Sequence, residues 1–352
     1  MADWILSTEF IEPTELTGLI RAALADQTTN RFTLARWLPN VEIDDLTFEF
    51  VKGGGGLSEA SSYRSWDTES KIGRREGIGK IMGELPPISE KIPLNEYDRL
   101  RLRKLNENDD RVLRLIARDV QRIARNIAAR FELGRGPALF DAQLPIPELR
   151  TTVSFGRDAS MSVVAATLWS DHANATPLND LEQWIAAYED LNGQTPAVIL
   201  MSKAIRSHLK QCEQIIRQVF PLAPAGTAPM INDDQLNAVL ASQGLPPIEI
   251  YDARTKVDGV VTRITPQNMI ALLPEPGATS AGQPGELGAT LLGTTAEALE
   301  EDYAIAPGDQ PGVVAAQFKT RDPIRLWTHA AAIGAPIVRE PNLTMRAQVL
   351  AA

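Results

Sequence analysis

The stretch DDRVLRLIARDVQRIARNIAARFEL, residues 109–133, decides the fold that we predict for this chain. On a helix of 3.6 residues per turn, its apolar side chains fall on one side and its arginines on the other. The predicted buried side consists of Val112, Ile116, Val120, Ile123, Ile127 and Phe131, with Leu113 and Ala124 beside them. The opposite side consists of Arg111, Arg114, Arg118, Arg122 and Arg125. The pattern predicts a single amphipathic helix of roughly 37 Å.

Both ends of this helix carry sequence signals. Asp109 or Asp110 can cap the N-terminus by accepting backbone N–H bonds. Gly134, Gly136 and Pro137 are expected to end the helix, because glycine suits a left-handed terminal residue and proline lacks a helical N–H. Two interpretations stay open. The helix is either a surface helix with solvated arginines or a structural spine whose arginines meet acidic neighbours in an assembly.

The composition indicates a folded protein of about two domains. The 352 residues are 44% hydrophobic and 23% charged, and a chain of this length can bury a large core. The net charge of −10 is not the basic footprint of a nucleic-acid-binding protein. Cys212 is the single cysteine, which excludes an intrachain disulfide and a cysteine metal site. The chain has no long apolar run and no basic signal-like start, so we expect a soluble protein of the cytoplasm.

The residues before the long helix indicate an arm followed by an extended loop. The arm contains a helix that begins at about Pro13, and residues 41–52 alternate as a strand. A flexible joint follows, made of Gly53, Gly54, Gly55 and Gly56. Residues 57–91 contain too few large apolar side chains to fold alone, so they are either disordered or an extended arm that lies on another surface, and we favour the arm. One side of a two-stranded ribbon is predicted to hold Ile78, Ile81, Met82 and Leu85.

The residues after the long helix predict a mixed α+β domain. A proline-rich connection, residues 134–147, leads to a strand around Val153. Residues 184–273 then alternate between helical and strand patterns. The elements expected there are a helix ending at Gly193, a buried strand at 196–201, a helix from Ser202 to about Phe220, a helix and strand within 233–254, and strands at 257–263 and 269–273.

The end of the chain predicts one more strand. Leu343, Met345, Ala347 and Val349 alternate with polar residues. We expect this strand to pack with the long helix and with the Val153 strand.

No motif for catalysis or ligand binding is convincing. The stretch GRREGIGK, residues 73–80, misses the phosphate-loop spacing, and Ile81 stands where that loop needs a hydroxyl. His172, His208 and His329 lie far apart without metal-ligand spacing. Cys212 is expected to be a buried, inert thiol. We therefore expect no catalytic residue, no metal site, no cofactor and no enzyme activity.

The order of these parts, and several local patterns, resemble tailed-phage major capsid proteins. The stretches that carry the resemblance are MGELPPISEKIPLNEYDRLRLRKL (82–105), LRTTVSFGR (149–157), WSDHANATPLNDLEQWIAA (169–187), PAVILMSKAIRSHL (196–209) and RDPIRLWTHAAAIGAPIVREPNLTMRAQVL (321–350). Together they span nearly the whole chain. The chain is similar to the lambda-like capsid protein E family, which has the Hong Kong-phage-type capsid fold.

The resemblance implies an α+β phage major capsid fold with five segments. These are an N-terminal arm (1–46), an extended loop (47–92), a peripheral domain with the spine helix (93–183), an axial domain (184–320) and a C-terminal return into the peripheral domain (321–352). The loop would lie across a neighbouring subunit, which agrees with its lack of a core. The contacts expected between subunits involve Gly53, Gly54, Gly55, Gly56, Arg74, Arg75, Lys80, Met82, Leu85, Arg111, Arg114, Arg118, Arg122 and Arg125.

The resemblance also implies partners and a location. The expected partners are further copies in pentamers and hexamers, separate scaffolding and portal proteins, and packaged double-stranded DNA bound without sequence preference; a decoration protein is left open. No membrane partner is expected, and the location is the virion, assembled in the host cytoplasm. Some relatives join neighbouring subunits by a lysine–asparagine bond assisted by a glutamate. Lys71 or Lys80, with Asn342 and Glu340, are the residues available for it, although the lambda-like pattern implies no crosslink.

The predicted function is a major capsid protein that self-assembles into the icosahedral head of a tailed double-stranded DNA phage. One alternative is an encapsulin-like shell around a cargo enzyme. A second is a soluble α+β enzyme whose site lacks a recognisable motif. Megadalton shells or capsomers would favour the first two, and a discrete monomer or dimer the third.

Overall fold

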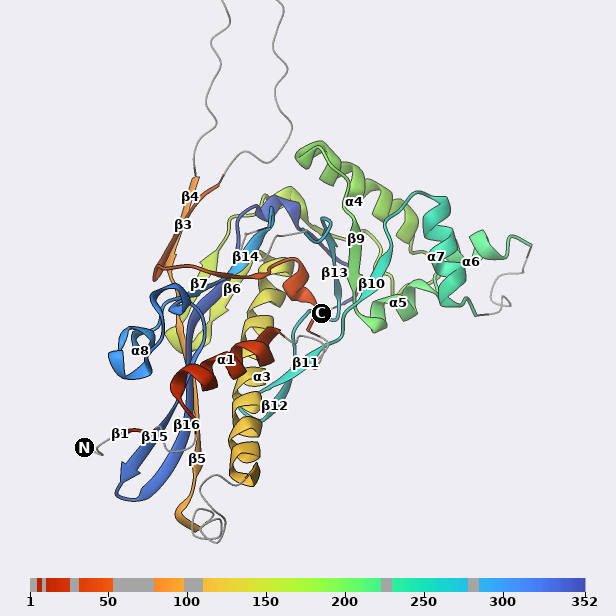
Figure 1. Cartoon of the computed structure of the whole chain (residues 1–352). Coiled ribbons are helices and arrows are strands. Elements are labelled where there is room, and N and C mark those ends of the chain that lie inside the picture. Colours follow the sequence, from red (N-terminus) through yellow and green to blue (C-terminus); the bar gives the residue numbers. More distant parts are fainter. Residues whose placement is uncertain are drawn as a thin grey trace, which may run out of the picture. The chain divides into compact units, whose positions relative to one another are not determined.

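The computed structural model describes residues 5–7, 11–25, 32–52, 79–97, 110–222, 230–277 and 285–351. The described chain has an α+β fold of helices and five sheets (Figure 1). It divides into two compact units. The first comprises Met1–Phe48, Met82–Arg135 and Ala278–Ile337, and the second comprises Glu49–Ile81, Gly136–Gly277 and Val338–Ala352. Among the described helices, none is both long and apolar enough to cross a membrane.

The long helix is present as α3 (Asp110–Asp141). Its predicted apolar side is buried at Ile116, Val120, Ile123, Ala124, Ile127 and Phe131, which confirms the amphipathic pattern. Arg114, Arg118, Arg122 and Arg125 are exposed on the other side. The capping role predicted for Asp109 and the side chains of Arg111 and Val112 lie outside the described residues.

The predicted end of this helix is wrong. Helix α3 continues through Gly134, Gly136 and Pro137, and the residue with a left-handed backbone after its last turn is Ala142, with φ 50°. The extra turns carry Ala138, Leu139 and Phe140, which are fully buried. Burial of these side chains offsets the weak helix propensity of glycine and proline. The proline-rich connection expected at 134–147 therefore begins only after Asp141.

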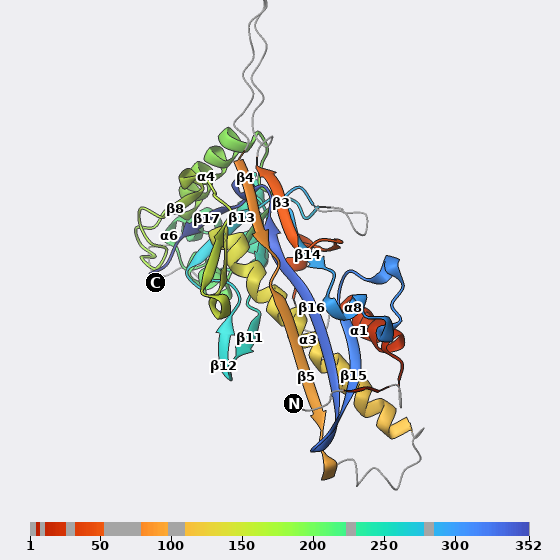
Figure 2. The ribbon, with the colours of Figure 1, turned by 90° about the vertical axis from the view of Figure 1, so that its left-hand side faces the viewer.

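The first unit is built on a six-stranded sheet. Its strands follow the order β1 (Ile5–Leu6), β15 (Val314–Arg321), β16 (Ile324–Val338), β14 (Gly288–Gly293) and β2 (Asn40–Glu42), and β5 (Pro87–Leu94) also pairs with β16. Strands β15 and β16 form a long antiparallel hairpin, from Val314 opposite Ala331 to Arg321 opposite Ile324. Figure 2 shows this hairpin with β5 along its side.

The two faces of this sheet pack against different helices. Helix α1 (Pro13–Ala25) and α3 share one apolar cluster with Ala315, Ala330 and Ala332. On the other face, α8 (Ala296–Leu299) and the turn Glu301–Tyr303 pack on Val314 and Ala316. The alternation of 314 and 316 with 315 follows from the two-residue period of a strand. The helix predicted at about Pro13 is thus confirmed, with Leu16 and Ile20 buried.

The strand predicted at residues 41–52 is divided in two. Strand β2 ends at Glu42 and β3 (Thr47–Lys52) follows, separated by a turn in which the Asp45 carboxylate accepts bonds from the backbone N–H and hydroxyl of Thr47. Strand β3 pairs with β4 (Gly79–Glu84), so the predicted two-stranded ribbon exists. Met82 and Leu85 do not share an apolar side as predicted, because Met82 is 65% exposed whereas Leu85 is buried. Ile78 and the side chain of Ile81 lie outside the described residues.

The end of the expected loop belongs to the first unit's own sheet. Strand β5 pairs with β16 from Pro87 opposite Ile333 to Leu94 opposite Leu326. Residues 87–92 thus have a full ladder partner within the chain. Residues 53–78 lie outside the described part.

The second unit is built on a five-stranded mixed sheet. The strand order is β10 (Ile248–Ile250), β9 (Val198–Met201), β13 (Met269–Leu273), β17 (Met345–Gln348) and β8 (Ser162–Val164). Its helices are α4 (Pro177–Asn192), α5 (Lys203–Leu209), α6 (Glu213–Val219) and α7 (Asp233–Ser242). Gly193 ends α4 with φ 71°, and β9 is a buried strand, both as predicted.

Two predicted elements of this unit are broken by turns. The helix expected from Ser202 to Phe220 is two helices, because Cys212 adopts an extended backbone before α6 and the first α6 residue, Glu213, donates its N–H to the His172 carbonyl. The strand expected at 257–263 is a hairpin of β11 (Arg254–Val257) and β12 (Val260–Arg263). Asp258 and Gly259 both have positive φ, 49° and 82°, as a two-residue hairpin turn requires.

The last strand has other partners than those predicted. Strand β17 pairs antiparallel with β13 and parallel with β8, whereas the Val153 strand, β7 (Thr151–Ser154), pairs with β6 (Gln143–Ile146). Its contact with α3 is an ion pair between Arg346 and Asp141. Alternation shows which side of a strand is buried, but not which strand lies beside it.

Short 3-10 turns complete the fold at Leu34–Arg36, Pro147–Leu149, Ala159–Met161, Pro307–Asp309 and Pro341–Leu343.

Candidate assembly site

The exposed side of α3 forms a row of cations, which we call the arginine face: Arg114, Arg118, Arg122 and Arg125. Spacings of three and four residues place these side chains on one side of a helix. Asp119 lies half-buried beside them, and burial raises the pKa of its carboxyl group against the opposing effect of Arg122. The row is suited to contact an acidic surface.

Most loop residues in the predicted contact set lie outside the described residues. These are Gly53, Gly54, Gly55, Gly56, Arg74 and Arg75, and Lys71, which was considered only for a crosslink, lies outside them too. Lys80 is described only as part of the β4 backbone. Of the remaining loop residues, Met82 is exposed and Leu85 is buried beneath the ribbon, where its backbone N–H binds the Leu46 carbonyl at 2.9 Å.

Asn342, named for a possible crosslink, has a structural role in the second unit. Its side-chain oxygen accepts the backbone N–H of Asp158 at 2.9 Å, and its carbonyl accepts the Asn192 side chain at 3.0 Å. Glu340 is half-buried two residues earlier. Asn342 thus joins the segment before β17 to two other segments of its own unit, one through its side-chain oxygen and the other through its backbone carbonyl.

Two of the three histidines meet in the second unit. Nε2 of His172 lies 2.9 Å from Nδ1 of His208, so one ring donates a hydrogen bond and the other accepts it. Burial and the neighbouring His172 lower the pKa of His208. No sequence pattern indicates this pair, because the two residues come from different elements, a loop and α5. The third histidine, His329, stacks edge-on against Phe318 in the first unit.

Neither this pair nor Cys212 belongs to a larger cluster of possible metal ligands in the described residues. Within the described ranges, no group of three or more His, Cys, Asp or Glu side chains is placed to hold a metal ion. Cys212 is fully buried, and burial together with Asp171 and Asp180 raises the pKa of its thiol to about 12. The thiol is therefore protonated at neutral pH and unsuited to act as a nucleophile.

A buried ion pair in the C-terminal third of α3 holds this helix to the N-terminal arm. Glu132 is 0% exposed and accepts bonds from Arg135 at 3.0 Å and from the backbone N–H of Leu34 at 2.9 Å. Arg135 also donates to Thr290 of β14 and to Asn40 of β2. The sequence does not indicate this cluster, since charged residues at i and i+3 on a helix are usually solvent-exposed.

A half-buried cation, Arg157, lies in the second unit. Arg157 donates to the Phe140 carbonyl at 2.7 Å and to the Thr344 hydroxyl at 3.1 Å. Burial and the nearby Arg346 lower the pKa of its guanidinium to about 10, against the effect of Asp141. The arrangement ties the end of α3 to the segment before β17.

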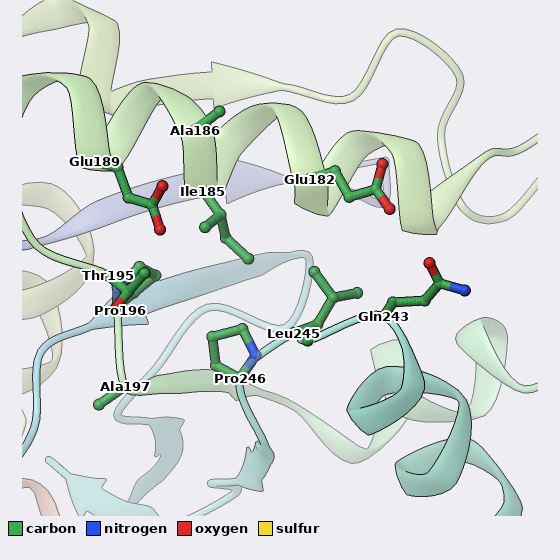
Figure 3. A pocket seen from close by; sticks show the side chains of 11 residues that line it. Glu182, Ile185, Ala186, Glu189, Thr195, Pro196, Ala197, Gln243, Leu245 and Pro246 are labelled. Atoms are coloured by element: carbon green, nitrogen blue, oxygen red, sulfur yellow. The ribbon is translucent and has the colours of Figure 1, made fainter.

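The second unit also carries an open groove of about 330 Å³. Figure 3 shows Glu182, Ile185 and Glu189 projecting from α4 toward Leu245 and Pro246, which precede β10. Its lining consists of Glu182, Ile185, Ala186, Glu189, Thr195, Pro196, Ala197, Gln243, Gly244, Leu245 and Pro246. The groove therefore combines two carboxylates with an apolar floor and contains no cation.

Comparisons with known proteins agree with this fold. A family model described as phage major capsid protein E matches residues 16–349. A crystal structure of a phage-related protein from Bordetella bronchiseptica RB50 is similar, with TM-score 0.60, 13% identity, and 98% of this chain and 97% of that chain covered. A protein described as a prophage capsid protein from E. coli CFT073 also has TM-score 0.60, with 12% identity and 99% of each chain covered. At such identities the two structures show a shared fold. A search of curated proteins finds no significant sequence match.

Proposed function

Because the chain belongs to the phage major capsid protein E family, we propose that its copies form the pentamers and hexamers of an icosahedral head. The single observation that carries this is the family match over residues 16–349, nearly the full length. The chain is a major capsid protein that forms the head shell of a phage, a structural component of the virion and not an enzyme. The match favours this function over an encapsulin-like compartment and over a soluble enzyme.

We propose that the two compact units correspond to the peripheral and axial domains of the subunit. The first unit, with most of α3 and the β15–β16 hairpin, would be peripheral, and the second unit, with the five-stranded sheet, would be axial. Two domain boundaries in this proposal then differ from those expected from the sequence. Residues 285–320 pack with the sheet beside α3, and residues 338–351 join the sheet that contains β9 and β13.

We propose that the extended loop packs against a neighbouring copy of the chain. Its polar composition over residues 57–78 supports this, because such a segment buries little apolar surface by itself. The exposed side chain of Met82, at the foot of the ribbon, adds an apolar group to the same surface. The arginine face is proposed as a second contact surface, since the chain's 45 acidic residues against 35 basic ones make every neighbour a net anion.

The partners proposed beyond further copies are separate scaffolding and portal proteins and packaged DNA bound without sequence preference. A covalent crosslink between subunits is not proposed. Denaturing gels of mature particles should then show one band near the chain mass of 38.4 kDa, and a ladder of larger bands would contradict this.

Sedimentation and negative-stain microscopy of the purified protein test the proposed function. Megadalton shells or capsomers are expected, and a protein that stays a monomer or dimer at all concentrations would overturn it. Replacing residues 57–78 by a short glycine–serine linker should give a monomer with unchanged thermal unfolding that forms no stable shell. If that variant unfolds instead, the loop belongs to the core of its own subunit.

A further inference from the structure

The hairpin β11–β12 presents exposed apolar and cationic side chains. Val260 and Val261 are 67% and 57% exposed, and Arg254 and Lys256 are exposed as well. Lys256 is paired with Val261 across the hairpin, so these two side chains project from the same face, with Arg254 two residues away on that face. This face of the hairpin therefore carries the apolar side chain of Val261 beside two cations, and Val260 projects from the other face.

The base and the turn of this hairpin are both well defined. Arg263 forms an ion pair with Asp252 at 2.7 Å, which holds the last residue of β12 to the segment before β11. The Asp258–Gly259 turn has the positive φ values that match the natural twist of two antiparallel strands. The hairpin thus presents its side chains from an ordered backbone, which lowers the entropy lost on binding.

The groove between α4 and the residues before β10 has the complementary chemistry. Glu182 and Glu189 stand about two turns apart on α4, with Ile185 on the turn between them, and Leu245 and Pro246 lie opposite (Figure 3). The cations of the hairpin can pair with the two carboxylates of the groove, and the apolar side chain beside the cations can contact the apolar floor of the groove. Opposite charges across an interface also fix its register and speed association.

The topology of the second unit places the groove at the N-terminal ends of strands β9 and β10 and the hairpin beyond their C-terminal ends. Strands β9 and β10 are parallel, and the groove residues Thr195–Ala197 and Leu245–Pro246 immediately precede them. The hairpin follows β10 in the chain, so it begins on the side of the sheet where the C-terminal ends of both strands lie. Figures 1 and 2 show α4 and the hairpin at opposite ends of this unit. The hairpin of one chain therefore cannot reach its own groove.

We propose that the β11–β12 hairpin of one copy docks into the α4 groove of a second copy of this chain. Arg254 and Lys256 would pair with Glu182 and Glu189, and Val261 would cover Ile185 and Leu245. Two different surfaces that meet head-to-tail generate a closed ring or a larger lattice rather than a simple dimer. The contact rests on the proposed function, because it supplies one of the repeated contacts from which a shell is built.

Charge reversal tests the contact. The variants Glu182→Lys/Glu189→Lys and Arg254→Glu/Lys256→Glu should each lose shells and capsomers in sedimentation while keeping the thermal unfolding temperature of the unmodified chain, since none of the four side chains is buried. A chain with all four changes should recover assembly, because the two surfaces are again complementary. Asp190→Lys, an exposed charge change on α4 outside the groove lining, should assemble as the unmodified chain does.

A cysteine pair adds a direct measurement. A chain with Val261→Cys and Ala186→Cys should form disulfide-linked multimers on mild oxidation of assembled particles, and either single change should not. Assembly of both reversed variants at the unmodified level, with no linked multimers, would overturn the docking while leaving the proposed function intact. An unmodified chain that forms no shells or capsomers would overturn the proposed function and this contact with it.

Discussion

The two parts of α3 are helical for different reasons. From Leu113 to Phe131 the apolar residues recur every three or four positions, and their burial is enough to explain the helix. From Glu132 to Asp141 the chain contains Gly134, Gly136 and Pro137, which favour a helix end. This second part is helical because its side chains are held by a buried ion pair and by close packing. A local pattern can therefore predict the first part, whereas the second depends on residues far away in sequence.

The sharpest test of the first part is a charge on its buried side. Ile123→Asp places a carboxylate where the side chain is fully buried, and an unpaired buried charge costs several kcal/mol. We expect an insoluble or unfolded protein, and the same for Ile116→Asp. Arg125→Asp, on the exposed side two residues away, is the matched control and should fold. Soluble shells formed by Ile123→Asp would show that this side of the helix is not buried.

The next largest effect is expected at the start of the second part. Glu132→Ala leaves Arg135 buried without its carboxylate partner, and breaking a buried pair in this way costs about 3–5 kcal/mol. The double change Glu132→Leu/Arg135→Met removes both charges and should cost less. Denaturant unfolding of the two variants compares them directly. A single change no worse than the double change would mean that water reaches Arg135.

Gly136 tests the close packing of the second part. A Cβ atom at this position would lie 2.0 Å from the Ile264 carbonyl oxygen, so Gly136→Ala forces the backbone apart and should cost about 1–3 kcal/mol. Gly18→Ala in helix α1 is the control, because no atom lies within 4 Å of its Cβ. That change should stabilise the protein by about 0.5–1 kcal/mol through helix propensity. If the two substitutions change the unfolding free energy equally, close packing at Gly136 is not the cause of its effect.

A smaller effect compares the two units through their histidines. Burial lowers the pKa of His208 in the second unit and of His329 in the first below the ordinary value of 6.5. Below pH 6.5 the unfolded chain thus binds more protons than the folded one, so stability is complete above that pH and falls as pH decreases through the lowered pKa values. The thermal unfolding temperature should fall on acidification. His208→Gln and His329→Gln should each make the unfolding temperature depend less on pH. If neither change alters this pH dependence, these two histidines are not its cause.

The smallest effect on stability is expected at the arginine face. Arg118→Glu/Arg122→Glu alters only exposed side chains of the first part of α3, so its unfolding free energy should change by less than about 1 kcal/mol. Assembly should nevertheless weaken, because the proposed contact with an acidic neighbour is reversed in sign. Sedimentation beside denaturant unfolding separates the two effects. Normal shells from this variant would leave the arginines as a solvated surface.

Sequence patterns predicted the elements whose stability is local. The period of 3.6 residues in α3 and α4, the continuous apolar run of β9 and the alternation of β17 each reported which side chains are buried. The predicted strand at 257–263 was wrong although Asp258–Gly259 is a strong turn signal. The helix from Ser202 was predicted too long because its interruption at Cys212 depends on the carbonyl of His172.

The candidate site was less predictable than the fold. The arginine face follows from helical spacing alone, and its exposure at Arg114, Arg118, Arg122 and Arg125 was expected. The groove was not predicted, since Glu189 and Pro246 meet only when β9 and β10 lie side by side. The same holds for Glu132 with Leu34 and for His172 with His208. No spacing rule relates residues that belong to different elements.

By itself the sequence determined which faces of its helices and strands are apolar, and through the order of those elements it pointed to the capsid family. Tertiary structure alone decided that α3 continues to Asp141, that β17 lies between β13 and β8, and that β5 joins the sheet beside β16. The physical reason is the range of the interactions. Side-chain periodicity is set by neighbours within one turn or one strand, whereas helix ends and strand partners are chosen by burial and hydrogen bonding across the whole chain.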